Sequence, residues 1–186
     1  MSTRLKLLLL LFFTFCIGRM QAQVKEPEFI GEVYYLDPAG NATLLEKQHV
    51  VLKTKAGASM YLFGIGKIKT KINVKNPKSS TRFPASDTLR FVVKAVDNAS
   101  DPMSIVQLFQ FKPSSKARKA EVSSTGSFSG EAKNKLAYLP FTASKYGDSS
   151  YLIKVVNVLP GEYGVIVLNP NDEDEKNTIV SCFGID

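Results

Sequence analysis

The sequence predicts an all-β fold, an antiparallel β-sandwich of about ten strands that follows an N-terminal signal peptide. Short runs rich in Val, Ile, Phe, Tyr and Thr are separated by clusters of Gly, Pro, Asn, Asp and Ser. These clusters recur at the spacing of about eight to twelve residues that is typical of sandwich folds. After residue 22, no run shows a sustained helical periodicity. The three observations together favour two packed antiparallel sheets.

Residues 1–22 have the pattern of an export signal. Arg4 and Lys6 precede an apolar run of about eleven residues, a length that suits a signal peptide and is too short to cross a bilayer. Cleavage is expected after Ala22. Cys16 suggests a rival interpretation, the lipid-acceptor cysteine of a bacterial lipoprotein. That pattern requires small residues before the cysteine, and this chain instead has Phe13, Thr14 and Phe15.

The expected mature chain, residues 23–186, is destined for the periplasm, the outer-membrane surface or the medium. At this length a single domain buries roughly 68–70% of its unfolded surface, so a single β-sandwich domain is expected. Cys182 is the one cysteine that remains after cleavage, which leaves no partner for an internal disulfide. A subdomain break within 113–135, a segment rich in serine, lysine and arginine, is the alternative organisation.

The strand signals are easy to place along the mature chain. The clearest alternation lies in residues 67–75, where Ile72 and Val74 fall on one face and lysines fall on the other. The turn at 159–162 has Pro and Gly at the positions that favour a type II turn, so it predicts a hairpin between its two neighbouring strands. The expected strands are 29–36, 43–45 or 49–53, 59–63, 67–75, 89–96, 105–111, 136–141, 151–158, 163–168 and 178–183.

Two resemblances bear on fold and compartment. Residues 160–167, a Pro-Gly-Glu-Tyr turn that leads into Gly-Val-Ile-Val, resemble the late hairpin of immunoglobulin-like and carboxypeptidase-regulatory-like modules. This implies an immunoglobulin-like sandwich, with a jelly-roll-like one as the alternative. Residues 145–151 and 174–186 resemble an uncharacterised family of exported β-rich proteins of gut-type Gram-negative bacteria. The family has no known activity, so the resemblance implies a compartment and no chemistry.

Basic residues are concentrated in the middle of the chain. The net charge is +7, and removal of the signal leaves 21 basic against 17 acidic residues, of which residues 47–94 contain eleven basic and one acidic. A stripe of lysines on one strand face suits an anionic polysaccharide or lipopolysaccharide phosphates, and it also suits a strand whose charges discourage pairing with other chains. Nucleic acid is not expected, because the stripe has no interleaved aromatic residues and the protein is exported. The stripe consists of Lys67, Lys69, Lys71 and Lys75.

The remaining candidate residues have simple structural interpretations beside their functional ones. Tyr146, in a Lys-Tyr-Gly-Asp loop, is the best exposed ring for stacking on a sugar. His49 is the single histidine and Cys182 lies in an apolar run, so both are expected to be structural, and neither a catalytic triad, a zinc site nor a cofactor is expected. Asp172 and Asp174, in an acidic stretch that also suits a solvated turn, are the calcium candidates.

The sequence therefore favours an exported, non-enzymatic binding or interaction module of the bacterial cell envelope, whose partner is an anionic glycan or a protein. One alternative is an envelope hydrolase that uses paired carboxylates, which a cleft holding two carboxyl groups of raised pKa would favour. The other is a structural accessory subunit that pairs through an exposed strand edge. No transmembrane span is expected.

Overall fold

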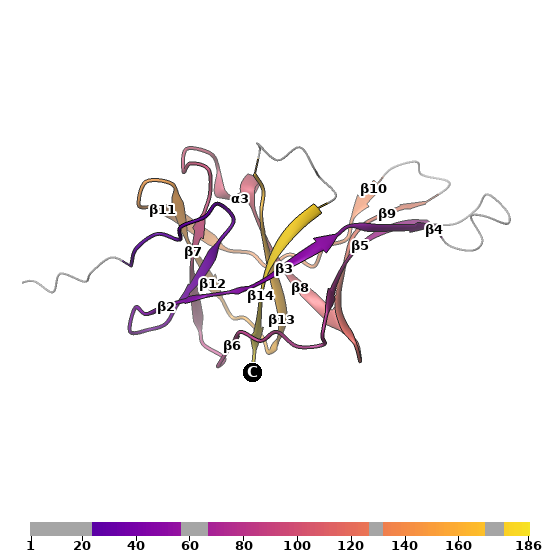
Figure 1. Cartoon of the computed structure of the whole chain (residues 1–186), viewed down its shortest axis with the longest axis horizontal. Coiled ribbons are helices and arrows are strands. Elements are labelled where there is room, and N and C mark those ends of the chain that lie inside the picture. Colours follow the sequence, from indigo (N-terminus) through magenta and orange to yellow (C-terminus); the bar gives the residue numbers. More distant parts are fainter. Residues whose placement is uncertain (1–23, 57–66, 127–131, 170–176) are drawn as a thin grey trace, which may run out of the picture.

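A computed structural model describes residues 24–56, 67–126, 132–169 and 177–186. It confirms the predicted fold class, since these residues form two antiparallel sheets packed together as an all-β sandwich (Figure 1). The described part of the chain contains fourteen strands, more than the ten expected, and one short helix, α3 (Pro102–Ile105). None of its helices is long and apolar enough to cross a membrane. The expected signal peptide lies outside the described residues.

The smaller sheet has five strands in the order β11-β12-β7-β1-β2. Every pair in it is antiparallel, and β1 forms a hairpin with β2, which overlaps the strand expected at 43–45. Its strands are β1 (Val33–Leu36), β2 (Ala42–Leu44), β7 (Thr88–Lys94), β11 (Thr142–Tyr146) and β12 (Ser150–Val156).

The larger sheet has nine strands, seven of them in the order β3-β14-β13-β8-β9-β5-β4. The other two lie off this path: β10 (Ala132–Asn134) pairs with β9, and β6 (Arg82–Phe83) runs parallel to β14. The seven are β3 (Glu46–Val51), β4 (Lys53–Ala56), β5 (Lys67–Lys75), β8 (Val106–Pro113), β9 (Ala117–Gly126), β13 (Gly161–Val167) and β14 (Asn177–Ile185).

The larger sheet curls back on itself. Its two end strands, β3 and β4, are separated along the chain by Leu52 alone, yet β3 pairs with β14 and β4 pairs with β5. One continuous stretch of chain therefore joins the two ends of the sheet, and β3 lies against β5. The outer part of the curl, made of β4, β5 and β9, extends away from the five-stranded sheet (Figure 1).

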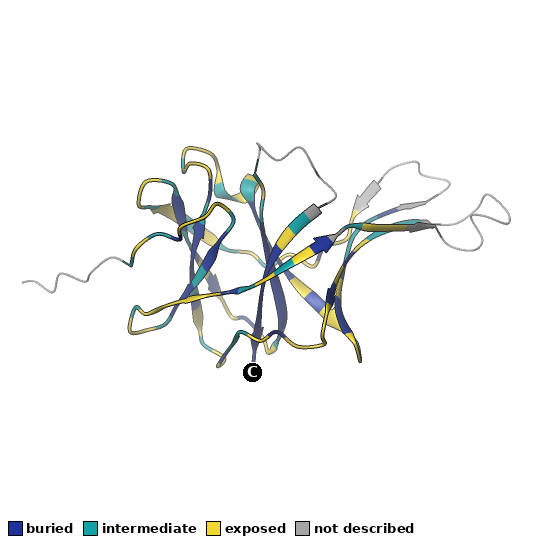
Figure 2. Ribbon diagram, in the orientation of Figure 1, coloured by how far each residue is buried: buried dark blue, intermediate teal, exposed yellow. Residues whose placement is uncertain are grey.

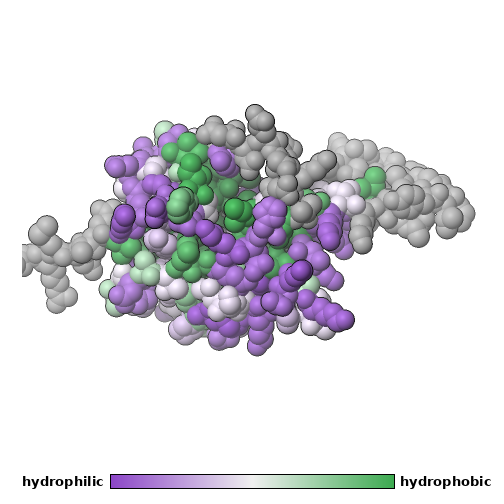
Figure 3. All heavy atoms as spheres, in the orientation of Figure 1, coloured by the Kyte–Doolittle hydropathy of each residue, from purple (hydrophilic) through white to green (hydrophobic). Residues whose placement is uncertain are grey.

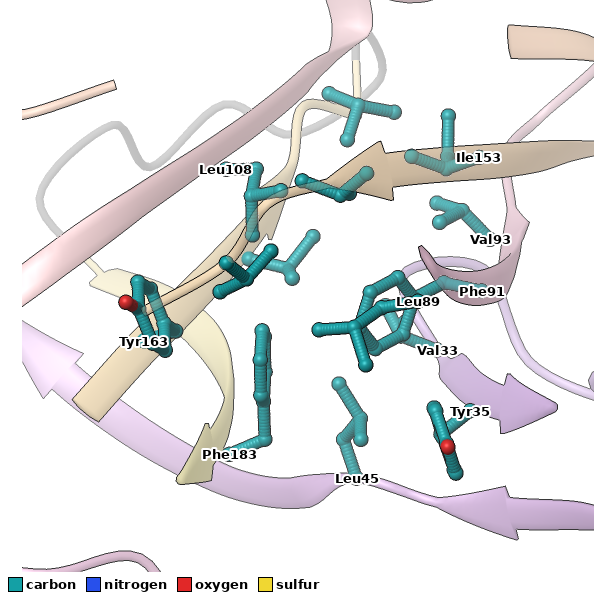
Figure 4. Close-up of a cluster of buried hydrophobic side chains, with 14 of the residues drawn as sticks. Val33, Tyr35, Leu45, Leu89, Phe91, Val93, Leu108, Ile153, Tyr163 and Phe183 are labelled. Atoms are coloured by element: carbon teal, nitrogen blue, oxygen red, sulfur yellow. The ribbon is translucent and has the colours of Figure 1, made fainter. Parts of the chain in front are cut away.

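Each side of the larger sheet covers a separate apolar core. The first core lies between the two sheets, where Phe91, Phe183 and Tyr163 pack ring against ring with centroids 5.0 and 5.3 Å apart (Figure 4). The second lies inside the curl, and its members include Ile72, Val74 and Phe109. Figure 2 shows the buried residues running along the central strands between these two regions. The strands β8, β13 and β14 thus bury side chains on both faces, as expected for the middle layer of a packed protein.

Several sequence expectations need correction. Residues 136–141 form no strand beyond a single bridge at Tyr138, and the strand begins at Thr142 instead. The turn at 159–162 makes no hairpin, because β12 belongs to the smaller sheet and β13 to the larger. The strand β9 was missed within the serine-rich segment 113–135, where it pairs along the whole of β5. The strand expected at 59–63 lies outside the described residues.

Candidate functional site

Alternating residues of β5 carry the lysine stripe, as the sequence predicted. Ile72 and Val74 are buried in the second core, whereas Lys71 and Lys75 are exposed on the opposite face. Lys69 is partly exposed, and its Nζ lies 3.2 Å from a carboxylate oxygen of Glu121. The residue Lys67 begins β5, and its side chain lies outside the described part of the structure. The stripe thus lies on the outer surface of the curled sheet.

Neighbouring strands add lysines to the same surface, which sequence reasoning missed. The register places Lys53 of β4 opposite Lys71, Lys119 of β9 opposite Asn73, and Lys112 of β8 opposite Lys119. Residues that stand directly opposite each other on antiparallel strands share one face. Lys53, Lys112 and Lys119 are all exposed. Figure 3 shows hydrophilic residues over much of the lower and central part of the side of the molecule that it presents. We call this surface of four strands the lysine face, defined by Lys53, Lys69, Lys71, Lys75, Lys112 and Lys119.

Like charges on the lysine face stand unusually close together. Lys53 lies opposite Lys71, and Lys112 lies opposite Lys119, although like charges in direct cross-strand pairs destabilise a sheet. Among the described residues that pair along this face, Glu121 is the one carboxylate, and it forms an ion pair with Lys69. The other five lysines have no ion-pair partner within the described ranges. This concentration of positive charge attracts anions, and the repulsion between the lysines lowers the stability of the protein when no anion is bound.

Tyr146 does not belong to this surface. It ends β11, a strand of the other sheet, and its hydroxyl donates a hydrogen bond of 2.5 Å to the backbone carbonyl of Val24. The ring is partly buried instead of lying in an exposed loop. The structure therefore does not bring Tyr146 together with the lysines.

A second cluster of charged side chains surrounds a buried arginine where β9, β3 and β13 meet. Arg118 of β9 is fully buried, its Nη2 donates to Glu46 Oε1 at 2.9 Å, and its Nη1 lies 3.6 Å from Glu162 Oε2. Arg82 reaches the other oxygen of Glu162 at 2.6 Å and also pairs with Asp186 at 2.6 Å. This cluster, which we call the buried ion network, ties four strands to the C-terminal residue of the chain.

The loop before β6 completes the buried ion network with neutral donors. The backbone N–H of Ser79 donates to Glu162 Oε2 at 2.7 Å, and the backbone N–H of Ser80 donates to Glu46 Oε2 at 2.6 Å. The hydroxyl of Ser79 also donates to Glu46. Burial by itself raises the pKa of Glu46, but the hydrogen bonds from Ser79, Arg118 and Ser80 outweigh it and lower the pKa to about 2.

The carboxylates of the buried ion network are paired with arginines of the same fold, which differs from the arrangement of two catalytic carboxyls. A hydrolase of that type needs one carboxyl that stays protonated near neutral pH. Glu46 has a lowered pKa, and Glu162 forms ion pairs with Arg82 and Arg118. Both side chains are therefore occupied by partners within the fold, and they have a structural role.

The remaining sequence candidates lie apart from both clusters. His49 is exposed on β3, and Cys182 is fully buried on β14, where burial raises the pKa of the thiol to about 12. Asp172 and Asp174 lie outside the described residues. Within the described ranges, no group of three or more His, Cys, Asp or Glu side chains is arranged to hold a metal ion.

Taken together, the fold and this surface define the class of the protein as an all-β sandwich with a basic sheet face. Comparison of the chain with models of protein families, with curated proteins and with solved structures finds no match.

Proposed function

We propose that the protein is an exported, non-enzymatic binding module of the bacterial cell envelope, and that its lysine face binds an anionic glycan. The proposal rests on one observation, the two pairs of directly opposed lysines, Lys53 with Lys71 and Lys112 with Lys119. Each pair disfavours the free fold and is relieved when an anion lies between its ammonium groups.

The shape of the lysine face favours an extended polymer over a small anion. Residues two apart on one strand are about 6.8 Å apart, so Lys69 and Lys75 lie on the order of 20 Å from each other along β5. Neighbouring strands add charges roughly 4.8 Å to the side. A chain of sugars with repeated carboxylate, sulfate or phosphate groups can meet several of these lysines at once.

The choice of a glycan rests on compartment and on the residues of the face. The expected signal at 1–22 and the resemblance of 145–151 and 174–186 to an exported bacterial family both favour a location outside the cytoplasm. The residues that alternate with the buried side chains of β5 are lysines and Asn73, with no aromatic ring for stacking on bases. Envelope polysaccharides are the polyanions that such a protein meets.

The two alternative functions are less well supported by the described residues. A hydrolase that uses paired carboxylates needs a carboxyl group of raised pKa, whereas the pKa of Glu46 is lowered. An accessory subunit needs an accessible strand edge, but in the five-stranded sheet the edge strand β2 has three residues, and the edge strand β11 carries Lys145 directly opposite Tyr151 of β12. Short edge strands and lysines on an edge strand are two ways in which proteins prevent edge pairing.

The test is salt-dependent binding to a sulfated glycan such as immobilised heparin. A variant with Lys53, Lys71, Lys75 and Lys119 all changed to Gln is expected to elute at much lower salt. Each lysine near an anionic surface contributes about 1 kcal/mol, so the four together contribute about 4 kcal/mol, a loss of affinity on the order of a thousandfold at low salt.

The matched control has four exposed lysines elsewhere changed to Gln, which alters the net charge equally. Suitable positions are Lys25, Lys78, Lys145 and Lys154, all exposed in the structure. The control is expected to keep most of the wild-type retention. Equal loss in the two variants would show that net charge drives the binding, and the lysine face would then not be the site.

A further inference from the structure

The turn between β11 and β12 has the form of an anion-binding cradle. Gly147 adopts a left-handed conformation, with φ of +57°, and the two backbone N–H groups that follow it point toward one spot. The N–H of Asp148 donates to a carboxylate oxygen at 2.6 Å, and the N–H of Ser149 donates to the second oxygen at 3.2 Å. Successive N–H groups in such a turn form a concavity that attracts anions.

Two side chains complete the cradle. Ser150, which is fully buried, donates its hydroxyl to the carboxylate at 2.5 Å. Lys94 of β7 pairs with Ser150 in the sheet register, and its Nζ lies 3.0 Å from the same oxygen. The Lys94 side chain is 18% exposed, so its charge is directed at this spot from within the sheet.

The absence of a side chain at Gly147 makes the space for the anion. A Cβ at this position would overlap the carboxylate oxygen and the carbon that bears it. Because the φ of Gly147 is also strained for any other residue, the turn is suited to glycine on two separate grounds. Together the donors and the open space make up a built site, which we call the carboxylate cradle and define by Lys94, Gly147, Asp148, Ser149 and Ser150.

The occupant of the carboxylate cradle comes from the chain itself. It is Glu26, which lies 122 residues before Asp148 in the segment that precedes β1. All four donors bind its carboxylate, and Tyr146 holds the carbonyl of Val24 nearby. Burial raises the pKa of Glu26, but the hydrogen bonds from Ser150, Asp148, Lys94 and Ser149 lower it to about 2.

We propose that the carboxylate cradle is a binding site for a single carboxylate group, that Glu26 is its resident ligand, and that residues 24–28 form a strap which this ligand holds in place. The donor set selects the ligand class. Two oxygen atoms are bound, one by Asp148 and the other by Ser149, Ser150 and Lys94, which matches a carboxylate. Lys94 supplies one positive charge, which balances the single negative charge of a carboxylate.

This proposal is independent of glycan binding, since the carboxylate cradle is on the five-stranded sheet and the lysine face is on the other. It predicts that removal of the Glu26 side chain leaves a vacant site for a free carboxylate. Acetate is the simplest probe, because it carries the same group with almost nothing attached.

The experiment compares wild type, Glu26→Ala and Glu28→Ala by following backbone amide signals during an acetate titration at constant ionic strength. In Glu26→Ala, the amides of Asp148, Ser149 and Ser150 are expected to shift saturably, with a Kd on the order of millimolar for so small a ligand. Wild type is expected not to respond because Glu26 fills the site. Glu28 is exposed in the same segment, so Glu28→Ala is expected to behave like wild type.

A second measurement keeps the proposal testable if Glu26→Ala folds poorly. Acetate is then expected to raise the Tm of Glu26→Ala selectively over chloride at equal ionic strength, with no selective rise in Glu28→Ala. In Glu26→Gln, which retains the length of the side chain, the amides of Asp148 and Ser149 lose their charged acceptor and are expected to exchange hydrogen faster. Absence of both acetate effects in Glu26→Ala, or equal effects in wild type, would overturn the proposal.

Discussion

Replacement of Arg118 by Met is expected to be among the most destabilising single changes in this protein. The guanidinium is fully buried, donates to Glu46 at 2.9 Å and lies 3.6 Å from Glu162. The central carbon of this guanidinium, Cζ, also lies 6.0 Å from the centre of the Phe111 ring. Met fills a similar volume, so the change removes the charge with little change in packing.

The expected loss is about 3 kcal/mol in the free energy of unfolding at pH 7. Removing one partner of a buried ion pair costs roughly 3–5 kcal/mol, because a charge is left without compensation. The lower end of the range applies here because Glu162 keeps Arg82 at 2.6 Å, while Glu46 keeps the serine donors Ser79 and Ser80.

The loss should also depend on pH. Glu46 has a pKa of about 2 in the folded protein, against an ordinary glutamate value of 4.5, so its contribution to stability is present above pH 4.5 and is lost as the pH falls toward 2. Without Arg118 the pKa of Glu46 is lowered less, so the difference between variant and wild type is expected to shrink at acid pH.

The assay is equilibrium unfolding in urea at pH 7 and at pH 3.5, with Lys119→Met as the matched control. Lys119 is the exposed neighbour of Arg118 on β9, and its replacement is expected to change stability by no more than about 0.5 kcal/mol. A loss below about 1 kcal/mol for Arg118→Met would refute the reasoning. So would a loss that is as large at pH 3.5 as at pH 7.

Three further predictions follow from single contacts. Glu121→Gln is expected to increase retention on heparin, because it releases Lys69 from its one ion pair; unchanged or weaker retention contradicts this. Cys182 is expected to resist a thiol reagent at pH 8 until the protein unfolds, since burial raises its pKa to about 12, and rapid labelling of the native protein counts against its buried position. Gly164→Ala is expected to lower stability by about 1–3 kcal/mol in a thermal melt, because its Cβ would stand 2.8 Å from the ring of Phe109 in the second core; an unchanged Tm contradicts it.

The strand β5 shows what an alternation of polar and apolar residues can predict from sequence alone. Lysines and Asn73 alternate there with apolar residues and Thr70 over 67–75, and the structure forms a strand with the same bounds. The pattern depends only on the geometry of an extended chain, which places successive side chains on opposite faces. The same rule therefore predicted the burial of Ile72 and Val74 and the exposure of Lys71 and Lys75.

The strand β9 shows where the same patterning fails. Its buried positions include Arg118 and Ala120. A charged residue therefore occupies a position at which an apolar residue would have indicated a strand. An extra residue at Val122 also shifts the alternation, since Ser123 pairs with Thr70 and Glu121 pairs with Lys71. A buried arginine is stable only beside its carboxylate partners, and those come from β3 and β13.

The sequence alone determined the features that depend on neighbours along the chain, namely the strand-rich fold class and the lysine stripe of β5. Tertiary structure decided the features that depend on pairing between distant segments. Lys112 and Lys119 join the lysine face through strand register, and Glu26 meets Asp148 across 122 residues. Local steric rules act over two or four residues, whereas register and loop closure are settled by the burial of the whole core, which no short segment contains.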